Sequence, residues 1–314
     1  MLRACVLVVH IFIAMALVSG QNITGAGYGS PVPVPVAPCQ LVTFYSPLAS
    51  PSGTADISAP SFPLPSNFGG ISAQVTTEKG AFSAAILREF LVDYGSVDTG
   101  TIVLVSRSGA ATIQIPCDVP LGLQRYSLVL SNSNTAGGTQ LGYLDLVMAA
   151  DSIHVLRVGD TLTAAAFRIQ ANPVLGLATH VDGSAVTAAS PAKQGETIAI
   201  WAVGLGLPSS GTVQTGAANP VPPLSTSVNI DFDFRANAGP TPPSTANYGG
   251  PHVPATKIPA YFAPGLAGLY QINVTIPPSP VPLAACSGSS SLSNLTINIG
   301  GTSSFDGAQI CVAP

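Results

Sequence analysis

The chain has 314 residues and a formal net charge of −4, and only 8% of its residues are charged, against roughly 25% in a typical soluble protein. It therefore has no basic surface for phosphate groups, which excludes nucleic acid as an expected partner. The high glycine and proline contents, 32 and 29 residues, predict short strands joined by turns rather than helices.

The first twenty residues, Met1–Gly20, have the pattern of a cleaved secretory signal peptide. A positively charged start and the apolar run Ala4–Val18 precede a small-residue cleavage site before Gln21. No later stretch is long and apolar enough to span a bilayer. The mature protein is expected to be secreted, outside the cell or at its surface, and residues 21–38, with the proline-rich run Pro31–Pro38, are expected to form an extended spacer.

Four cysteines remain in the mature chain: Cys39, Cys117, Cys286 and Cys311. In an exported protein they predict two disulfides, for which three connectivities are open. The pairs Cys39–Cys117 and Cys286–Cys311 are favoured because each bond then closes within one expected domain. There is no Cys-x-x-Cys pair and no histidine at ligand spacing, so neither a metal nor another cofactor is expected.

The first half of the mature chain contains a series of short stretches typical of strands. They are Cys39–Tyr45, Ile71–Thr77, Thr101–Ser106, Ala111–Pro116 and Tyr126–Ser131. Phe82–Val92 is ambiguous between a strand and a short helix. Leu141–Asp160 is expected to hold the last strand of a first domain and the crossover to a second.

A second copy of this pattern follows. Gly195–Trp201 resembles Cys39–Tyr45, Asn273–Pro277 resembles Thr112–Pro116, and Asn294–Ile299 resembles Tyr126–Ser131. The copies keep their order at offsets of about 156–168 residues, which predicts a duplicated β-sandwich. The expected domains are 39–150 and 151–314.

The second copy carries an insertion at Ala236–Pro259, between an expected strand at Ile230–Phe234 and the alternating run Tyr270–Ile276. It is rich in proline and glycine and lacks periodicity. Long connections of this kind are often binding segments. Tyr248 and His252 are the candidate ligand-contacting residues there, with polysaccharide as the candidate ligand.

Several stretches together resemble a C-terminal module of exported proteins from Solibacter and other Acidobacteria. They are Ser190–Glu196, Gly204–Gly206, Thr215–Ala218, Pro223–Ser225 and Phe262–Pro277. The resemblance runs from about Gly109 to the C-terminus, and Pro38–Tyr45 resembles the immunoglobulin-like unit that often precedes the module. It implies an all-β fold of two tandem immunoglobulin-like β-sandwich domains, with no activity attached. This chain differs in its insertion and in its four mature cysteines.

Residue types that could carry chemistry are sparse. His180, Asp182 and Ser184 are the types of a hydrolase triad, but their spacing does not place the histidine between the other two, and Asp182–Gly183 favours a tight turn. Asp231 and Asp233 share one side of an expected strand, where a solvated face is favoured over a calcium site. No catalytic residues are assigned.

The function expected from the sequence is that of a secreted, non-catalytic β-sandwich protein with a structural, adhesive or surface-assembly role, including a fibre or layer subunit. Self-association or contact with cell-surface or matrix components is the expected partnership. The alternatives are a carbohydrate-binding module that uses residues 236–259, and an enzyme of unrecognised type, which clustering of Asp231, Asp233, His252 or Glu78 in one cleft would support.

Overall fold

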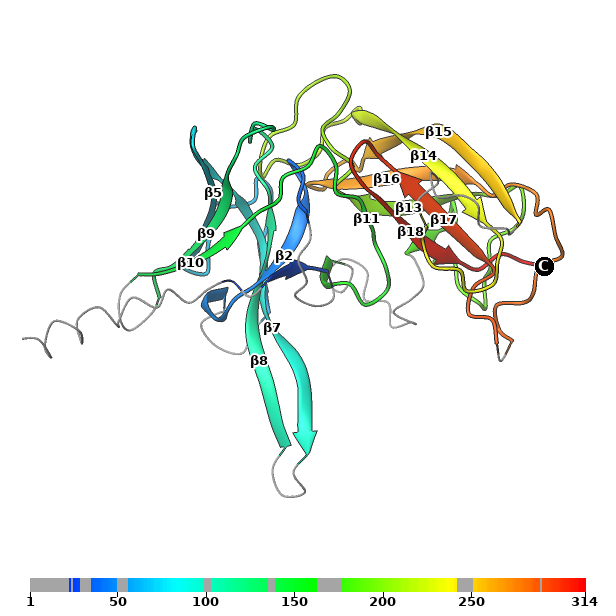
Figure 1. Ribbon diagram of the computed structural model, residues 1–314, viewed down its shortest axis with the longest axis horizontal. Coiled ribbons are helices and arrows are strands. Elements are labelled where there is room, and N and C mark those ends of the chain that lie inside the picture. Colours follow the sequence, from blue (N-terminus) through cyan, green and yellow to red (C-terminus); the bar gives the residue numbers. More distant parts are fainter. Residues whose placement is uncertain are drawn as a thin grey trace, which may run out of the picture.

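The fold is seen in a computed structural model that describes residues 23–314 apart from 24, 29–34, 50–55, 99–102, 135–138, 163–176, 242–250 and 289. The described chain is all-β, as expected, with antiparallel strands in three sheets (Figure 1). Among these residues no helix has the length and apolar character needed to cross a membrane. The expected signal peptide, Met1–Gly20, and much of the expected spacer lie outside the described residues.

The first half of the chain forms two five-stranded sheets. One has the order β1-β2-β8-β7-β3, and the other runs β10-β9-β5-β4 with β6 on β5. The strands are β1 (Gly25–Gly27), β2 (Leu41–Tyr45), β3 (Ile57–Ser58), β4 (Asn67–Phe68), β5 (Ile71–Thr77), β6 (Gly80–Ser83), β7 (Ala85–Asp98), β8 (Val103–Gln114), β9 (Tyr126–Asn132) and β10 (Gln140–Asp145). A short 3₁₀ helix, η1 (Pro47–Ala49), follows β2.

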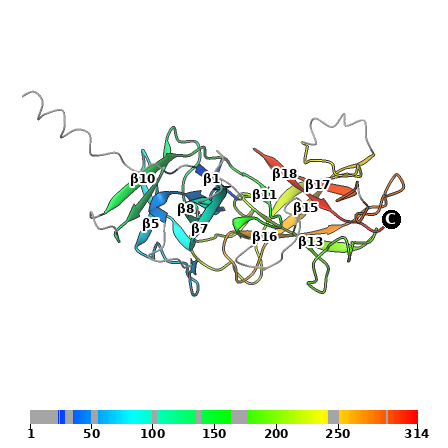
Figure 2. The same ribbon diagram turned by 90° about the horizontal axis from the view of Figure 1, so that it is seen from below.

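The second half forms one eight-stranded sheet beside the first two (Figure 2). Its order is β11-β13-β16-β15-β14-β17-β18, with β12 also on β13. The strands are β11 (His154–Val155), β12 (Ala178–Thr179), β13 (Thr197–Val203), β14 (Ser225–Asp233), β15 (His252–Phe262), β16 (Leu269–Thr275), β17 (Leu295–Gly300) and β18 (Phe305–Ile310).

The alternating run before Pro277 is confirmed as a strand. In β16, Tyr270, Ile272 and Val274 are buried while Asn273 and Thr275 are exposed, as a strand with one face on a core requires. Two of the three pairs of similar stretches occupy matching positions in the halves. In the first half β2 pairs with β8, and in the second half β13 pairs with β16. The third similar stretch differs: β9 lies in a separate sheet from β2, whereas β17 shares the sheet of β13. The immunoglobulin-like topology therefore stays a prediction.

Strand pairing settles one local ambiguity and corrects two local expectations. The ambiguous stretch Phe82–Val92 contains no helix; most of it belongs to β7, which pairs with β8. The insertion is shorter than expected, because β15 begins at His252 and pairs with β14. The expected spacer is not free of the fold, since Gly25–Gly27 pairs with β2 and Val36 is buried and bridged to Met148.

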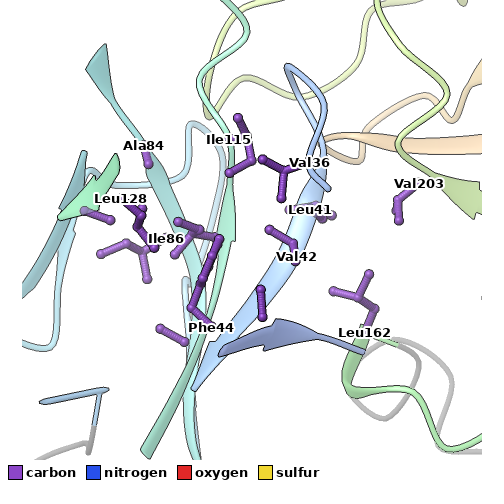
Figure 3. Packing of buried hydrophobic residues seen from close by; sticks show 14 of the residues in the cluster. Val36, Leu41, Val42, Phe44, Ala84, Ile86, Ile115, Leu128, Leu162 and Val203 are labelled. Carbon is purple, nitrogen blue, oxygen red and sulfur yellow. The ribbon is translucent and has the colours of Figure 1, made fainter. Parts of the chain in front are cut away.

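The apolar core of the first half continues into the second. Leu41 and Phe44 of β2 pack in one cluster with Ile86 on one side and with Leu162 and Val203 on the other (Figure 3). A separate cluster fills the second half, between β13, β14, β16 and β17. The expected boundary near residue 150 therefore crosses a shared core.

Stretches that resemble the exported module meet the first half at this junction. Gly204 and Gly268 have φ values of 73° and 61°, a conformation that favours glycine. An added Cβ at Gly204 would lie 2.9 Å from Gln40 Cδ, and one at Gly268 would lie 2.5 Å from Cys39 O. Gly216 N donates to Gln114 Oε1 at 2.6 Å. These motifs therefore join the two halves closely.

Candidate functional site

The cysteines fall into one bonded pair and one pair of thiols. The predicted Cys39–Cys117 disulfide is confirmed. Cys286 and Cys311 are buried free thiols in hydrogen-bond contact with each other. That contact, aided by backbone N–H groups, lowers the pKa of the Cys286 thiol to about 7, and it raises the pKa of the Cys311 thiol. The expected Cys286–Cys311 disulfide is therefore not formed in this structure, which corrects that half of the predicted pairing.

The two candidate ligand residues of the insertion have different outcomes. Tyr248 lies outside the described residues. His252 is the first residue of β15 and is the register partner of Asp233 on β14. The candidate for polysaccharide contact is thus placed at a strand end next to an acidic residue, and the ligand itself stays a prediction.

Asp231 and Asp233 lie on a buried polar face, so the expected solvated face is wrong. Their relative exposures are 2% and 0%. Asp233 binds Arg235 through both carboxylate oxygens, with Nε–Oδ1 and Nη2–Oδ2 distances of 3.0 and 2.5 Å. Asp231 Oδ1 has no hydrogen-bond partner among the described residues, and burial raises the pKa of Asp231.

This polar face anchors the start of the insertion. Thr296 Oγ1 and Gln309 Nε2 both donate to Ala238 O, at 2.6 and 3.0 Å, and Thr241 N donates to Asn298 Oδ1 at 2.9 Å. Because Asp233 lies opposite Thr296 and Asp231 lies opposite Asn298, the acids share the face that residues 238–241 cover. The polar side chains therefore fix a loop on the sheet.

Of the residues named for an unrecognised enzyme, the structure gathers only some. Asp231, Asp233 and His252 lie close together, and the His252 charge lowers the pKa of Asp231 against the larger effect of burial. Glu78 is in the other half, where it accepts a hydrogen bond from Gln124 N. In the described part of the chain, no three histidine, cysteine or acidic side chains are placed to hold a metal ion.

His180, Asp182 and Ser184 form a tight turn, as their sequence predicts. His180 N donates to Ser184 O at 2.8 Å, and Gly183 has a φ of 84°. Ser184 Oγ donates to Asp182, whereas His180 Nδ1 bonds Glu196 at 2.5 Å. The histidine is therefore turned away from the serine, and these contacts do not form a triad.

The structure also contains a polar cluster that the sequence analysis missed. His154 lies between two carboxylates, with Nε2 at 2.8 Å from Asp160 Oδ2 and Nδ1 at 3.1 Å from Asp306 Oδ2. Its ring stacks on Tyr28 at a centroid distance of 3.8 Å. Arg157 also binds Asp306, at 2.6 Å. No sequence signal marks this cluster, because Asp306 is distant along the chain.

The cluster predicts a pH-dependent stability. Burial lowers the pKa of His154, but hydrogen bonds and charges of Asp160 and Asp306 outweigh it, so the pKa is raised. The stabilisation is then fully present below the unfolded value of about 6.5 and is lost as the pH rises through the folded value. We expect His154→Gln to destabilise the protein most at low pH, in urea unfolding measured between about pH 6 and 9. Asp160→Asn should weaken this pH dependence. A difference in free energy of unfolding between the parent chain and His154→Gln that does not change with pH would contradict the prediction.

A second missed feature is a long two-stranded ribbon formed by β7 and β8. The two strands pair from Ala85–Gln114 out to Asp98–Val103. β2 pairs with β8 only over Ala110–Gln114, and β3 pairs with β7 only at Arg88 and Glu89. The outer ribbon, residues 91–98 and 103–108, therefore has two edges without a partner strand in the described structure, and it projects from the body (Figure 1).

Comparisons with known proteins add little to this geometry. Neither a protein-family model nor a curated protein matches the chain. Among solved structures, it is similar to the secreted serine protease VesC from Vibrio cholerae at 14% identity and a TM-score of 0.14. The match covers 93% of this chain and 52% of that chain, so this chain spans about half of the protease's length. A likeness this weak carries no argument about fold or function.

Proposed function

We propose that the chain is an exported, non-catalytic β protein with a structural or surface-assembly role, and that it assembles through the outer ribbon of β7 and β8. The observation that supports this proposal is the length over which neither edge of the ribbon has a neighbouring strand among the residues that the structure describes. The partner we propose is the same ribbon of a second copy. Membership in the exported Acidobacterial module is part of the same proposal and is supported by the sequence motifs alone.

Unpaired edges make this ribbon a suitable contact surface. Each edge strand presents a row of backbone N–H and C=O groups that can pair with another strand. An isolated two-stranded hairpin is only marginally stable in water, so a third strand would stabilise it. Pairing of two ribbons would give hydrogen-bond partners to the backbone groups at an edge of each copy.

The composition of the chain is compatible with close self-association. Only 8% of the residues are charged and the net charge is −4, so electrostatic repulsion between copies is weak. The outer ribbon contains Val92, Val103 and Val105, a residue type that is enriched in strands. Backbone pairing and apolar contact would thus act together.

The test is to shorten the ribbon without changing the body. Residues 93–107 are replaced by Asn-Gly, which joins the register partners Val92 and Ser108 through a two-residue turn. We expect the parent chain to form oligomers or fibres at high concentration and the shortened chain to stay monomeric. Analytical ultracentrifugation and electron microscopy measure the assembly, and circular dichroism checks the fold.

A matched control replaces only residues 99–102 by Asn-Gly, which keeps the pair Asp98–Val103 and the full length of both edges. This variant should assemble like the parent chain. A parent chain that stays monomeric at every concentration, or a shortened chain that assembles equally well, would refute assembly through the ribbon.

A further inference from the structure

A cavity of about 370 Å³ lies where the two halves of the chain meet. Its walls come from β2, from the segment after β3, from β7, from residues after β11 and from the turn before β16. Leucine side chains form much of the wall, including Leu41, Leu87, Leu156, Leu162 and Leu269. The cavity is thus built from both halves and includes Leu266 and Ala267 of the Phe262–Pro277 stretch.

The walls of the cavity are held in place by the backbone. Ala59 N donates to Leu87 O at 2.8 Å, Leu156 N donates to Trp201 O at 2.8 Å, and Ala263 N donates to Leu269 O at 2.9 Å. Each of these bonds fixes a wall segment to a neighbouring strand or turn. The site is therefore preformed, which lowers the entropic cost of binding.

The chemistry of the lining is apolar throughout its depth. None of the described lining residues is charged, and the polar side chains are those of Ser58 and Ser61, both at exposed positions. Leu41, Leu156 and Leu162 are buried. Burying an unpaired charge among such side chains is very costly, so a ligand must place an uncharged, apolar part inside.

Exposed apolar side chains form part of the rim of the cavity in the described chain. Phe62 is 37% exposed and Leu266 is 39% exposed, and both line the site. A sealed packing defect would have no such rim. Ligand pockets usually combine an apolar interior of roughly 300–1,000 Å³ with a few polar groups, and this cavity has both.

The volume sets the size of the ligand. An apolar cavity of about 150 Å³ holds one benzene molecule, so this cavity has room for roughly 12–15 non-hydrogen atoms by the same ratio. We propose that it binds an uncharged aliphatic molecule of medium chain length, such as a fatty alcohol or ester, with the hydrocarbon among the leucines and the oxygen near Ser58 and Ser61. This ligand site is independent of assembly through the ribbon.

The experiment titrates the full chain with the uncharged fluorescent probe N-phenyl-1-naphthylamine and then displaces the probe with 1-decanol. We expect saturable binding at one site and full displacement. Ala59→Trp places a large side chain in the cavity and should weaken binding by about tenfold or more. Val181→Trp is the matched control, because Val181 is 85% exposed and lies in the 180–184 turn, and its binding should equal that of the parent chain.

A second pair of variants keeps the test valid if Ala59→Trp does not fold. Leu266→Lys adds a charge at the exposed rim, and Leu121→Lys makes the same change at a residue that is 43% exposed and outside the cavity. Of these two variants, only Leu266→Lys should weaken binding of the probe. Absence of saturable binding, or equal binding by both members of each folded pair, would overturn the proposal. The proposal would also be overturned if the parent chain formed a dimer that Ala59→Trp dissociates and the probe leaves intact. A second copy of the chain would then be the occupant of the cavity.

Discussion

Replacing both Cys39 and Cys117 by serine is expected to lower the free energy of unfolding by about 4 kcal/mol, within the usual 2–5 kcal/mol for a native disulfide. The bond joins residues 78 positions apart, so its loss restores much freedom to the unfolded chain. Cys39 N also donates to Ile115 O at 3.1 Å, and Cys117 N donates to Thr215 Oγ1 at 2.9 Å. The disulfide therefore stabilises both the start of β2 and the contact between Cys117 and the second half of the chain.

Urea unfolding followed by the fluorescence of Trp201, the single tryptophan, measures this loss. The double variant Cys286→Ser and Cys311→Ser is the matched control, because it removes two cysteines that are free thiols in the structure. Reductant should destabilise this control to the level of the Cys39/Cys117 variant. Equal stability of the parent chain with and without reductant would contradict the prediction.

Asp151→Ala is expected to cost about 1.5–3 kcal/mol, because it removes a buried carboxylate that accepts several hydrogen bonds from the turn between β17 and β18. The Asp151 carboxylate is 2% exposed and accepts hydrogen bonds from the backbone N–H groups of Thr302, Ser303 and Ser304. The hydroxyl groups of Thr302 and Ser304 also donate to it. One side chain near the centre of the sequence thus holds the turn between β17 and β18.

Asp145→Ala is the control for this variant. Asp145 is exposed and accepts one hydrogen bond, from Ser127 Oγ at 2.6 Å, so its loss should change stability by no more than about 0.5 kcal/mol. Thermal and urea unfolding measure both variants. A cost below about 1 kcal/mol for Asp151→Ala would show that water satisfies the freed N–H groups.

The strands that sequence reasoning located best are those with one buried and one exposed face. Ile71–Thr77 is reproduced without change as β5, and Tyr126–Ser131 lies within β9. Alternation failed where both faces of a strand are buried, as over Ile230–Asp233 of β14, because polar side chains there meet a covering loop instead of water. The expectation of a solvated face for Asp231 and Asp233 was wrong for this reason.

The sites were less predictable than the strands. The turn at His180–Ser184 was predicted because turn preference depends on neighbouring residues. The His154 cluster and the Asp151 contacts join residues about 150 positions apart, and no local pattern marks such partners. The cavity is also invisible in the sequence, because leucines from five separate segments form it only when the halves meet.

The sequence by itself determined that this protein is built of strands and where several strands and turns begin, and it favoured the Cys39–Cys117 pair among three connectivities. These properties follow from side-chain alternation, turn residues and cysteine spacing, all of which are readable along the chain. Only the tertiary structure decided that the halves share a core, that β7 and β8 extend as a ribbon whose outer edges have no partner strand in the described chain, and that leucines line a cavity. Those features depend on which distant surfaces come into contact, and that is set by packing in three dimensions.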